Sequence, residues 1–257
     1  MLAPLGNLLI RHLLAPCCAA CNRDLAAPLE GALCQDCVAG VIAITPPICV
    51  RCGDHVPRFD TNVLCARCQR EPPVIVRARS AGVYDGALRD MIHALKYQKR
   101  RMIAPWLAAR MRDSGRSVLD GADAVIPVPL HPWRYLQRGF NQASDLAERL
   151  HCPVWHALWR HRGGPPQAGL PAARRQNNAR NAYAVVPGAH LRYPRLRGAV
   201  VVLVDDVMTT GATLNACALA LHGAGVASVR ALTAARAVAT RPPTRPPTPH
   251  LSIVHRR

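Results

Sequence analysis

The residue types best suited to chemistry in this chain are two adjacent carboxylates, followed by a short run of hydroxyl side chains and a glycine. Glycine lets a backbone approach a phosphate closely, and free N–H groups at the start of a following helix attract the same anion. Carboxylates repel phosphate but accept hydrogen bonds from a sugar diol. The segment therefore predicts a site for a phosphorylated sugar. Its residues are Asp205, Asp206, Thr209, Thr210, Gly211, Ala212 and Thr213.

A plainer interpretation of this segment is an ordinary strand-to-helix turn, in which one Asp and one Thr act as caps. That interpretation accounts for one carboxylate and one hydroxyl, but not for the whole series. The complete pattern favours a binding loop.

Four Cys-x2-Cys pairs near the start of the chain form a second set of residues whose spacing indicates a chemical role. The two cysteines of a pair lie on a tight turn and point the same way, so two pairs complete a tetrahedral sulfur site suited to zinc. Buried free cysteines would not show four equal spacings. Four pairs predict two closed structural Zn2+ sites without an open position for catalysis. The predicted ligands are Cys18, Cys21, Cys34, Cys37, Cys49, Cys52, Cys65 and Cys68.

Loop entropy does not decide which pairs share an ion. Sequential pairing closes a gap of 12 residues and an interleaved arrangement closes 27, a difference of only about 0.7 kcal/mol. The internal repeat favours sequential pairing, because each half then folds as a complete unit. Cys17 is an alternative ligand to its neighbour Cys18. Few large apolar residues separate the pairs, so metal binding would supply most of the folding free energy of this module.

Hydrophobic patterning predicts the elements that position the carboxylates. Residues 200–204 are five branched apolar residues, which indicate a central parallel strand that is covered on both faces and ends where the carboxylates begin. Alternating strands and helices predict an α/β fold, a doubly wound parallel sheet that binds ligand at the carboxyl ends of its strands. Further strands are predicted over residues 78–84, 124–129 and 228–235. Helices are predicted over residues 88–96, 141–150 and 214–223, with another ending near 112 before a loop at 115–121.

A second basic turn follows the predicted strand at 124–129. The segment HPWRYLQRGFNQ, residues 131–142, places Arg134 and Arg138 near a glycine, ahead of a helix that Asn141 is suited to cap. Because the carboxyl ends of parallel strands share one edge of a sheet, this turn predicts a second anion site beside the first.

The charge of the chain also indicates an anionic partner. The 257 residues carry a formal net charge of +18, and only Lys96 and Lys99 are lysines, so nearly all the excess is arginine, whose planar fork suits phosphate. Between Glu148 and Asp205 there are nine arginines and no acidic residue. This window predicts a segment that closes over polyphosphate or lies along a nucleic-acid backbone. A disordered basic loop is the plainer interpretation.

The expected compartment is the cytoplasm. No stretch is long enough to span a bilayer, and residues 1–15 lack the positively charged start of a signal peptide. Reducing conditions disfavour disulfides, which leaves metal binding as the better explanation for the cysteines.

The thirteen residues VVLVDDVMTTGAT at 201–213 resemble the signature of type I phosphoribosyltransferases. The resemblance implies that Asp205 and Asp206 hold the ribose hydroxyls of phosphoribosyl pyrophosphate. It also implies that residues 209–213 cradle the 5′-phosphate, and that Mg2+ accompanies the ligand.

Nearly the whole chain resembles the ComF family, competence-associated and GntX-like phosphoribosyltransferase-like proteins with an N-terminal double zinc ribbon. The resemblance rests on the ribbon cysteines, on Lys96-Tyr97, on the Arg-Gly-Phe-Asn-Gln element at 138–142, and on a later segment that ends in Asn-Ala-Tyr at 181–183. Residues 161–166, rich in Gly and Pro, are interpreted as a mobile lid. The residues implied for the pyrophosphate loop and lid are Leu130, Arg134, Arg138, Gln167, Arg174 and Arg175.

We therefore expect a double zinc-ribbon module with a short N-terminal helix over residues 1–70, a phosphoribosyltransferase-like domain over 71–239, and a disordered Pro/Arg-rich tail over 240–257. The ComF resemblance implies an accessory of DNA uptake, or of the use of DNA as nutrient, with single-stranded DNA and a competence helicase as partners. The alternative is an active phosphoribosyltransferase of nucleotide metabolism. No acceptor substrate and no catalytic residue can be identified from the sequence.

Overall fold

The structure is a computed structural model that describes residue 7 and residues 16–56, 63–160 and 182–238. Several predicted features lie outside these residues. They are the lid at 161–166, the site residues Gln167, Arg174 and Arg175, and the tail at 240–257.

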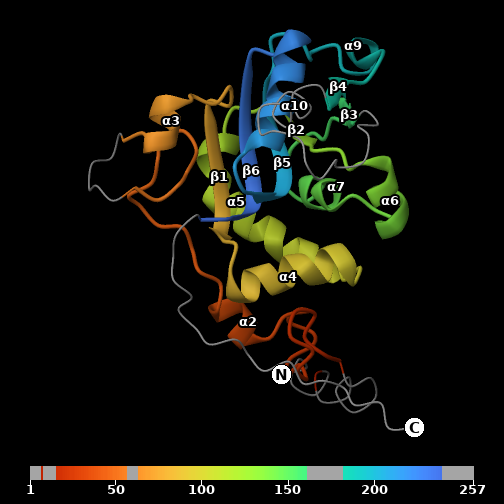
Figure 1. The fold of residues 1–257 in the computed structure, drawn as a ribbon. Helices are drawn as coiled ribbons and strands as arrows, with labels where there is room; N and C mark the ends of the chain where they lie inside the picture. Colours follow the sequence, from red (N-terminus) through yellow and green to blue (C-terminus); the bar gives the residue numbers. More distant parts are fainter. Residues whose placement is uncertain (1–6, 8–15, 57–62, 161–181, 239–257) are drawn as a thin grey trace, which may run out of the picture.

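Four parallel strands form the central sheet in the order β1-β6-β5-β2 (Figure 1). They are β1 (Arg77–Val83), β2 (Ala124–Pro127), β5 (Val200–Met208) and β6 (Ser228–Arg236). All four correspond to predicted strands, and β5 is central as expected. The predicted α/β class with a parallel sheet and a cysteine module is confirmed.

Different helices cover the two faces of the sheet (Figure 1). One face packs against α4 (Gly86–Tyr97), α5 (Ala104–Leu119) and α7 (Gln142–Ala147), and the other against α10 (Ala212–Gly223). Strand β5 contributes to both cores because its side chains alternate in direction. Val202 and Val204 lie in the first core, whereas Val201 and Leu203 lie in the second.

The remaining elements surround this sheet. The hairpin of β3 (Leu158–Arg160) and β4 (Tyr183–Val185) is antiparallel and packs near α10. The short helices are α2 (Gln35–Ala39), α3 (Ala66–Arg70), η1 (Arg101–Ile103), α6 (Pro132–Arg138) and α9 (Ala189–Arg192). No helix in the described part of the chain combines the length and apolar character needed to cross a bilayer.

Two element boundaries differ from the prediction. The loop predicted at 115–121 is wrong, because α5 continues to Leu119. Gly115 does not end the helix but lets it approach β6, where a Cβ on Gly115 would lie 2.6 Å from Leu232 Cδ1. Strand β5 was expected to end before the carboxylates, but its ladder with β6 continues to Met208. Asp205 and Asp206 are therefore strand residues with fixed side-chain directions.

The cysteine segments lie at two places against the sheet domain (Figure 1). The first lies beyond α4, and the second lies beside edge strand β1. Ala78 N donates to Arg51 O at 2.6 Å, and Val83 N donates to Ile42 O at 2.8 Å. These bonds cover backbone groups that an edge strand would otherwise leave open.

Candidate functional site

The two carboxylates near the end of β5 point to opposite faces of the sheet, as successive strand residues must. Asp206 faces α4 and α7, where Lys96 Nζ lies 2.7 Å from Oδ1 and Gln142 Nε2 donates to Oδ2 at 2.5 Å. Asp206 is only 5% exposed. Asp205 faces α10 and β4, near Cys217 and Tyr183, and its Oδ1 accepts from the backbone N–H of Asp206 at 2.8 Å.

This arrangement gives Asp205 an unusual proton affinity. Burial raises the pKa of Asp205 to about 8, and the negative charge of Asp206 adds to the rise. The backbone N–H of Asp206 and the charge of Lys96 act in the opposite direction. Asp205 is therefore mostly protonated at neutral pH, whereas Asp206 has a charged partner in Lys96.

The loop after β5 presents an open helix start. Gly211 caps α10 in the left-handed conformation, with φ of 77° and no side-chain hydrogen bond to the helix. Ala212 N lies 3.4 Å from Thr210 Oγ1, and the threonines at 209, 210 and 213 are exposed. Unsatisfied N–H groups at a helix start, with hydroxyls beside them, can bind a phosphate. The structure thus brings the predicted loop residues together beside the carboxylates.

The second predicted anion turn lies at the same edge of the sheet, because β2 pairs with β5 in parallel. Val128 N donates to Val204 O at 2.9 Å, and Asn141 Nδ2 donates to Val128 O at 3.0 Å. Asn141 also caps α7 through a 3.0 Å bond from Ala143 N, which confirms its predicted role. Leu130 lies in this turn, between β2 and α6.

The residues predicted as a basic turn form helix α6. Arg134 is exposed on this helix. Arg138 lies over the ring of Tyr97, with its Cζ 5.0 Å from the ring centroid. Both arginines therefore lie on α6, between the turn after β2 and the start of α7.

Three cations at the end of α4 and just after it have partners within the fold. Arg101 donates two 2.6 Å hydrogen bonds to the buried carboxylate of Asp145. Arg100 donates to Cys18 O at 3.2 Å, and Lys96 forms the ion pair already described. The sequence offered two signals for Lys96: it belongs to the Lys96-Tyr97 pair of the ComF resemblance, and it is one of only two lysines in the chain.

Two further residues near the loop were not assigned a role from the sequence. Tyr183 on β4 is buried near Thr213, and burial raises the pKa of its hydroxyl. Arg160 on β3 lies over the ring of Tyr183, with its Cζ 5.4 Å from the centroid. The hairpin therefore forms one wall of the loop.

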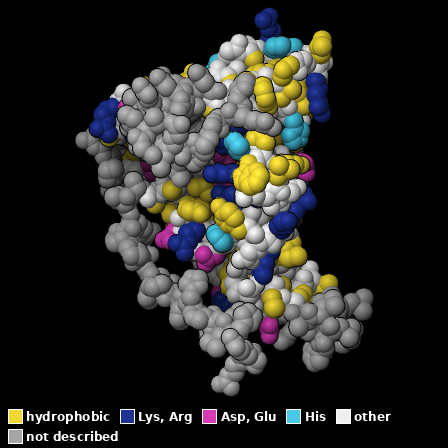
Figure 2. Space-filling model, turned by 45° about the vertical axis from the view of Figure 1, so that its right-hand side comes forward, with side chains coloured by type: hydrophobic (Ala, Val, Ile, Leu, Met, Phe, Trp, Pro, Cys, Tyr) yellow, Lys and Arg dark blue, Asp and Glu magenta, His cyan; other side chains and the backbone are white. Residues whose placement is uncertain are grey.

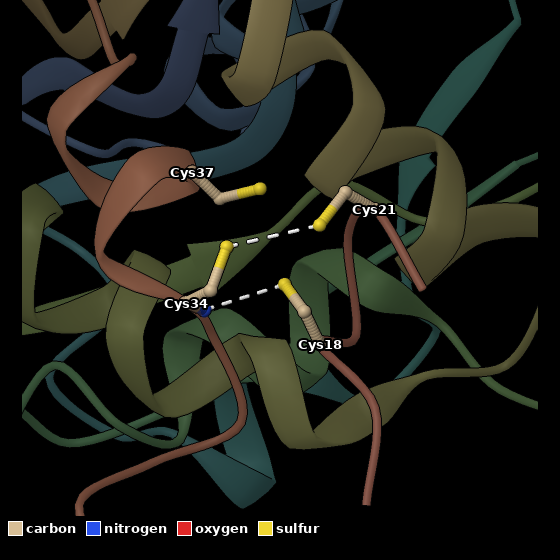
Figure 3. Close-up of side chains that lie close together, drawn as sticks. All are labelled: Cys18, Cys21, Cys34 and Cys37. Carbon is tan, nitrogen blue, oxygen red and sulfur yellow. Dashed lines mark hydrogen bonds between the residues drawn. The ribbon is translucent and has the colours of Figure 1, made fainter. Parts of the chain in front are cut away.

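The eight predicted zinc ligands form two groups in the sequential arrangement. In each group the sulfur atoms lie within 4.8 Å of one another. Figure 3 shows the first group, in which all four side chains converge and Cys21 Sγ lies 3.7 Å from Cys34 Sγ. In the second group Cys52 Sγ lies 3.6 Å from Cys65 Sγ. A tetrahedral site with Zn–S bonds of about 2.3 Å requires sulfur atoms about 3.8 Å apart, so both groups fit zinc.

The first ligand is Cys18, and the alternative Cys17 lies outside the group. Cys18 is fully buried, and its sulfur accepts from Cys34 N at 3.3 Å. Cys17 Sγ instead lies 3.8 Å from Asp24 Oδ1. Burial opposes ionisation of Cys21, but hydrogen bonds from Arg23 lower the pKa of its thiol to about 6. A thiolate is the form that binds metal.

The sheet, the loop and the two cysteine groups define a phosphoribosyltransferase-domain protein with a double zinc ribbon. Residues 136–248 match the phosphoribosyl transferase domain, and residues 9–69 match the double zinc ribbon domain. The chain belongs to the ComF/YhgH family, as the sequence resemblance predicted.

Three relatives illustrate this family. Competence protein F of Haemophilus influenzae is 31% identical, over 86% of this chain and 96% of that protein. DNA utilization protein YhgH of Escherichia coli K12 is 33% identical, over 71% of this chain and 81% of that protein. Competence protein ComFC of Bacillus subtilis is 26% identical, over 79% and 84% respectively.

Proposed function

We propose that this protein binds phosphoribosyl pyrophosphate with Mg2+ at the carboxyl ends of β5 and β2, and that it uses this site in the handling of DNA. The observation that carries the proposal is the open start of α10, which lies directly after two carboxylates. The match to the phosphoribosyl transferase domain supports the ligand. The names of the relatives, competence protein and DNA utilization protein, support the process.

In this proposal, different residues of the site bind the 5′-phosphate, the ribose and the pyrophosphate of the ligand. Residues 209–213 take the 5′-phosphate through backbone N–H groups and hydroxyls. Asp205 and Asp206 accept hydrogen bonds from the ribose hydroxyls, and Lys96 brings a cation beside them. The turn at Leu130 and the arginines of α6 lie toward the pyrophosphate, whose oxygens are the ligands that Mg2+ prefers.

Replacement of both carboxylates tests the sugar assignment. The double variant Asp205→Asn/Asp206→Asn keeps side-chain size and removes both carboxyl groups, including the charge of Asp206, so phosphoribosyl pyrophosphate affinity should fall by about 1.5–3 kcal/mol for the charged hydrogen bond lost at Asp206. Calorimetric titration measures this loss, and Thr210→Val should weaken the phosphate contact similarly. The matched control is Asp113→Asn, an exposed carboxylate on α5. Unchanged affinity in the double variant would remove the sugar-binding assignment.

A surface beside this site supports single-stranded DNA as a partner. None of the residues of α6 is buried, and its Trp133 is 63% exposed. Arg134 and Tyr135 are exposed next to it, and Arg138 covers Tyr97, which is 61% exposed at the end of α4. Figure 2 turns this side of the molecule forward and shows hydrophobic and basic side chains interspersed. Aromatic rings that stack bases, with cations beside them for phosphates, suit single-stranded nucleic acid.

A double variant on α6 tests this surface. Trp133→Ala/Arg134→Gln should lower single-stranded DNA affinity by about 1–3 kcal/mol for the lost stacking. It should also flatten the salt dependence by roughly 0.7 for the lost phosphate contact. The control Leu191→Ala/Arg192→Gln changes a similar exposed pair on α9. Fluorescence titration at several salt concentrations distinguishes them, and equal losses in both variants would contradict the assignment.

The role of the arginines between Glu148 and Asp205 is a separate prediction. Arg174, Arg175 and Arg180 lie outside the described residues. If they contact DNA, changing all three to Gln should flatten the salt dependence of DNA binding while phosphoribosyl pyrophosphate binding survives. If they belong to a lid, the same changes should leave DNA binding unaltered and abolish turnover.

The second candidate function is phosphoribosyl transfer, which the matched domain favours. A nucleophile would displace pyrophosphate at the anomeric carbon through an oxocarbenium-like state that the site stabilises electrostatically. Pyrophosphate release, measured against a panel of acceptors with and without single-stranded DNA, separates the two functions. Tight binding without release in any mixture would favour the binding function.

A further inference from the structure

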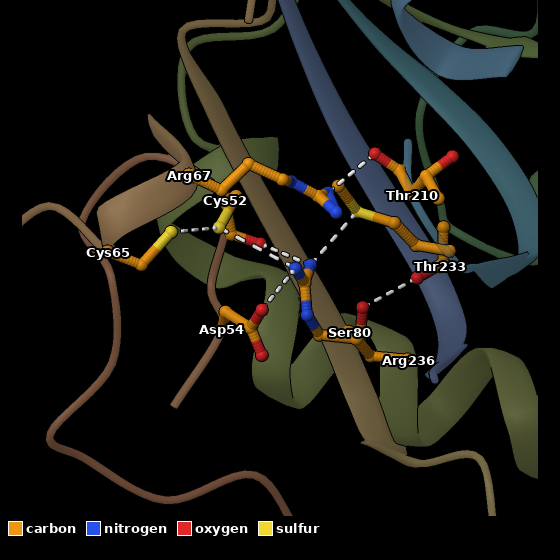
Figure 4. A network of polar contacts seen from close by, with 9 residues as sticks. Cys52, Asp54, Cys65, Arg67, Ser80, Thr210, Thr233 and Arg236 are labelled. Atoms are coloured by element: carbon orange, nitrogen blue, oxygen red, sulfur yellow. Dashed lines mark hydrogen bonds and ion pairs between the residues drawn. The ribbon is translucent and has the colours of Figure 1, made fainter. Parts of the chain in front are cut away.

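A side chain of the second zinc ribbon, the segment that holds the second cysteine group, contacts the predicted phosphate loop, residues 209–213. Arg67 lies on α3 between Cys65 and Cys68, two members of the second cysteine group. Its guanidinium Nη2 donates to the backbone carbonyl of Thr210 at 2.5 Å, across 143 positions of the chain (Figure 4). Because ligands flank Arg67 on both sides, a metal bound there would fix the position from which it donates.

A buried arginine makes a second connection between the same ribbon and the loop (Figure 4). Arg236, at the end of β6, is 1% exposed and donates to Cys52 O at 2.7 Å. The same nitrogen lies 3.2 Å from Met208 Sδ, and Nη2 pairs with Asp54 at 3.0 Å. Met208 in turn packs under Gly211, where an added Cβ would lie 2.9 Å from Met208 Cε.

The chain that leaves the ribbon makes a third connection. Val74 N donates to Asn215 Oδ1 at 2.8 Å, and Asn215 lies in the first turn of α10. The phosphate loop is therefore held at its threonine backbone, at the methionine beneath it and at the helix that follows it.

The first ribbon makes different contacts. Its Arg23 pairs at 2.8 Å with Asp36 in the same ribbon, and its Cys18 carbonyl accepts from Arg100 after α4. Arg23 also donates to the sulfur of Cys21 at 3.4 Å. It therefore resembles Arg67 in lying near zinc ligands, but none of its hydrogen bonds to the described residues goes to the phosphate loop.

Charge explains how metal in the second group would act on this connection. Four thiolates around one Zn2+ carry a net charge of −2, whereas four thiols carry none. Arg236 is a buried cation with Asp54 as its carboxylate partner, and Cys52 Sγ lies 3.6 Å from its Nη2. A loaded site would therefore place negative charge beside the buried cation of Arg236, in addition to Asp54.

We propose that the second zinc ribbon positions the phosphate loop, with Arg67 as the positioning residue and Arg236 as the buried link. The conformation in which the loop fits a phosphate then depends on the second ribbon, which lies far before the loop in the sequence. The part of this inference that concerns ligand affinity rests on the proposed function, whereas the part that concerns loop order does not.

The experiment compares Arg67→Ala with Arg70→Ala, which changes an exposed arginine later on the same helix, each as the full zinc-loaded chain. Hydrogen exchange should be about tenfold faster in Arg67→Ala at the amide of Asn215, which donates to Gly211 O at 2.8 Å at the start of α10, and phosphoribosyl pyrophosphate affinity should fall about three- to tenfold. Arg67→Lys keeps a donor and should recover most of both losses. Arg70→Ala should match the wild type in both measurements.

Each outcome decides the proposal. Wild-type exchange at the amide of Asn215 in Arg67→Ala overturns it. Loss of zinc from this variant also overturns it, because Arg67 would then serve the folding of its own ribbon. If the wild type binds no phosphoribosyl pyrophosphate, the proposed function fails, and the exchange measurement still tests the positioning role.

Discussion

Asp205 and Asp206 are neighbours in the sequence, but their surroundings in the fold differ. The strand directs Asp206 toward Lys96 and Gln142, whereas Asp205 lies on the other face, toward α10. A pair of adjacent acids in a loop would share one environment, and the extension of β5 prevents that. One carboxylate is thus charged and held, and the other can gain or lose a proton near neutral pH.

The raised pKa of Asp205, about 8, predicts a pH dependence of binding. Below pH 8 the free protein holds a proton on Asp205, and a neutral carboxyl is a weaker acceptor for ribose hydroxyls than a carboxylate. Phosphoribosyl pyrophosphate affinity should therefore rise about tenfold more between pH 7 and pH 9 in the wild type than in Asp205→Asn. Calorimetry at both pH values measures it, and parallel profiles would contradict the role of Asp205.

The same proton has the opposite effect on folding. The folded state retains a proton that the unfolded chain releases near pH 4, so this group's contribution to the free energy of unfolding falls as pH rises from about 4 to 8. The fall should be absent in Asp205→Asn. Urea unfolding across this range tests the sign.

Lys96 is predicted to be important for stability as well as for the site. In Lys96→Gln the largely buried Asp206 loses its cation, so the free energy of unfolding should fall by about 3 kcal/mol. Lys99→Gln, at an exposed position three residues further on, is the control and should be nearly neutral. Equal stability of the two variants, measured by urea unfolding, would show that the Lys96–Asp206 pair contributes little.

At the scale of elements, the close packing of α5 on β6 depends on Gly115. Gly115→Ala gains helix propensity, but its Cβ would lie 2.6 Å from Leu232 Cδ1, so we expect a net loss of about 1–3 kcal/mol. Gly223→Ala, also in a helix but with no atom within 4 Å of the added Cβ, should be neutral or stabilising. Thermal unfolding of both variants measures their stabilities. A Gly115→Ala variant at least as stable as Gly223→Ala would contradict the prediction.

The sequence predicted the elements whose signals are local. Five consecutive branched residues indicated β5, the cysteine spacing indicated both metal groups, and Asn141 indicated a helix start. The helix end predicted near Gly115 was wrong. In the sequence alone, a glycine that ends a helix cannot be distinguished from one that lets the helix pack closely on a strand. The contacts of Arg67 could not be predicted either, since they depend on where the second ribbon docks.

At the scale of the whole molecule, each ribbon is part of a different core. Cys18 and Cys37 pack with α4 and α5, whereas Cys49, Cys52 and Cys68 pack with the core on the α10 face. The ribbons therefore contact the phosphoribosyltransferase domain at separate places. Metal bound at either site would stabilise the contact that the ribbon makes with the domain.

We predict two Zn2+ per chain, which elemental analysis of the purified protein measures. Removal by a chelator should unfold residues 1–70 and loosen residues 209–213. Asp205 and Asp206 should stay ordered, because Asp206 is held from α4 and α7. Hydrogen exchange before and after chelation reports on each region. One zinc or none per chain, or exchange that is unchanged after chelation, would contradict this prediction.

The measurement that tests the central claim most directly is a crystal structure of the zinc-loaded protein with phosphoribosyl pyrophosphate and Mg2+. The proposal predicts the 5′-phosphate at the start of α10, within hydrogen-bond distance of the backbone N–H groups of residues 210–213. The ribose should lie toward Asp205 and Asp206, with the pyrophosphate toward Leu130 and α6. A ligand bound elsewhere, or a start of α10 that stays empty at saturating ligand, would contradict the assignment of this loop as the phosphoribosyl site.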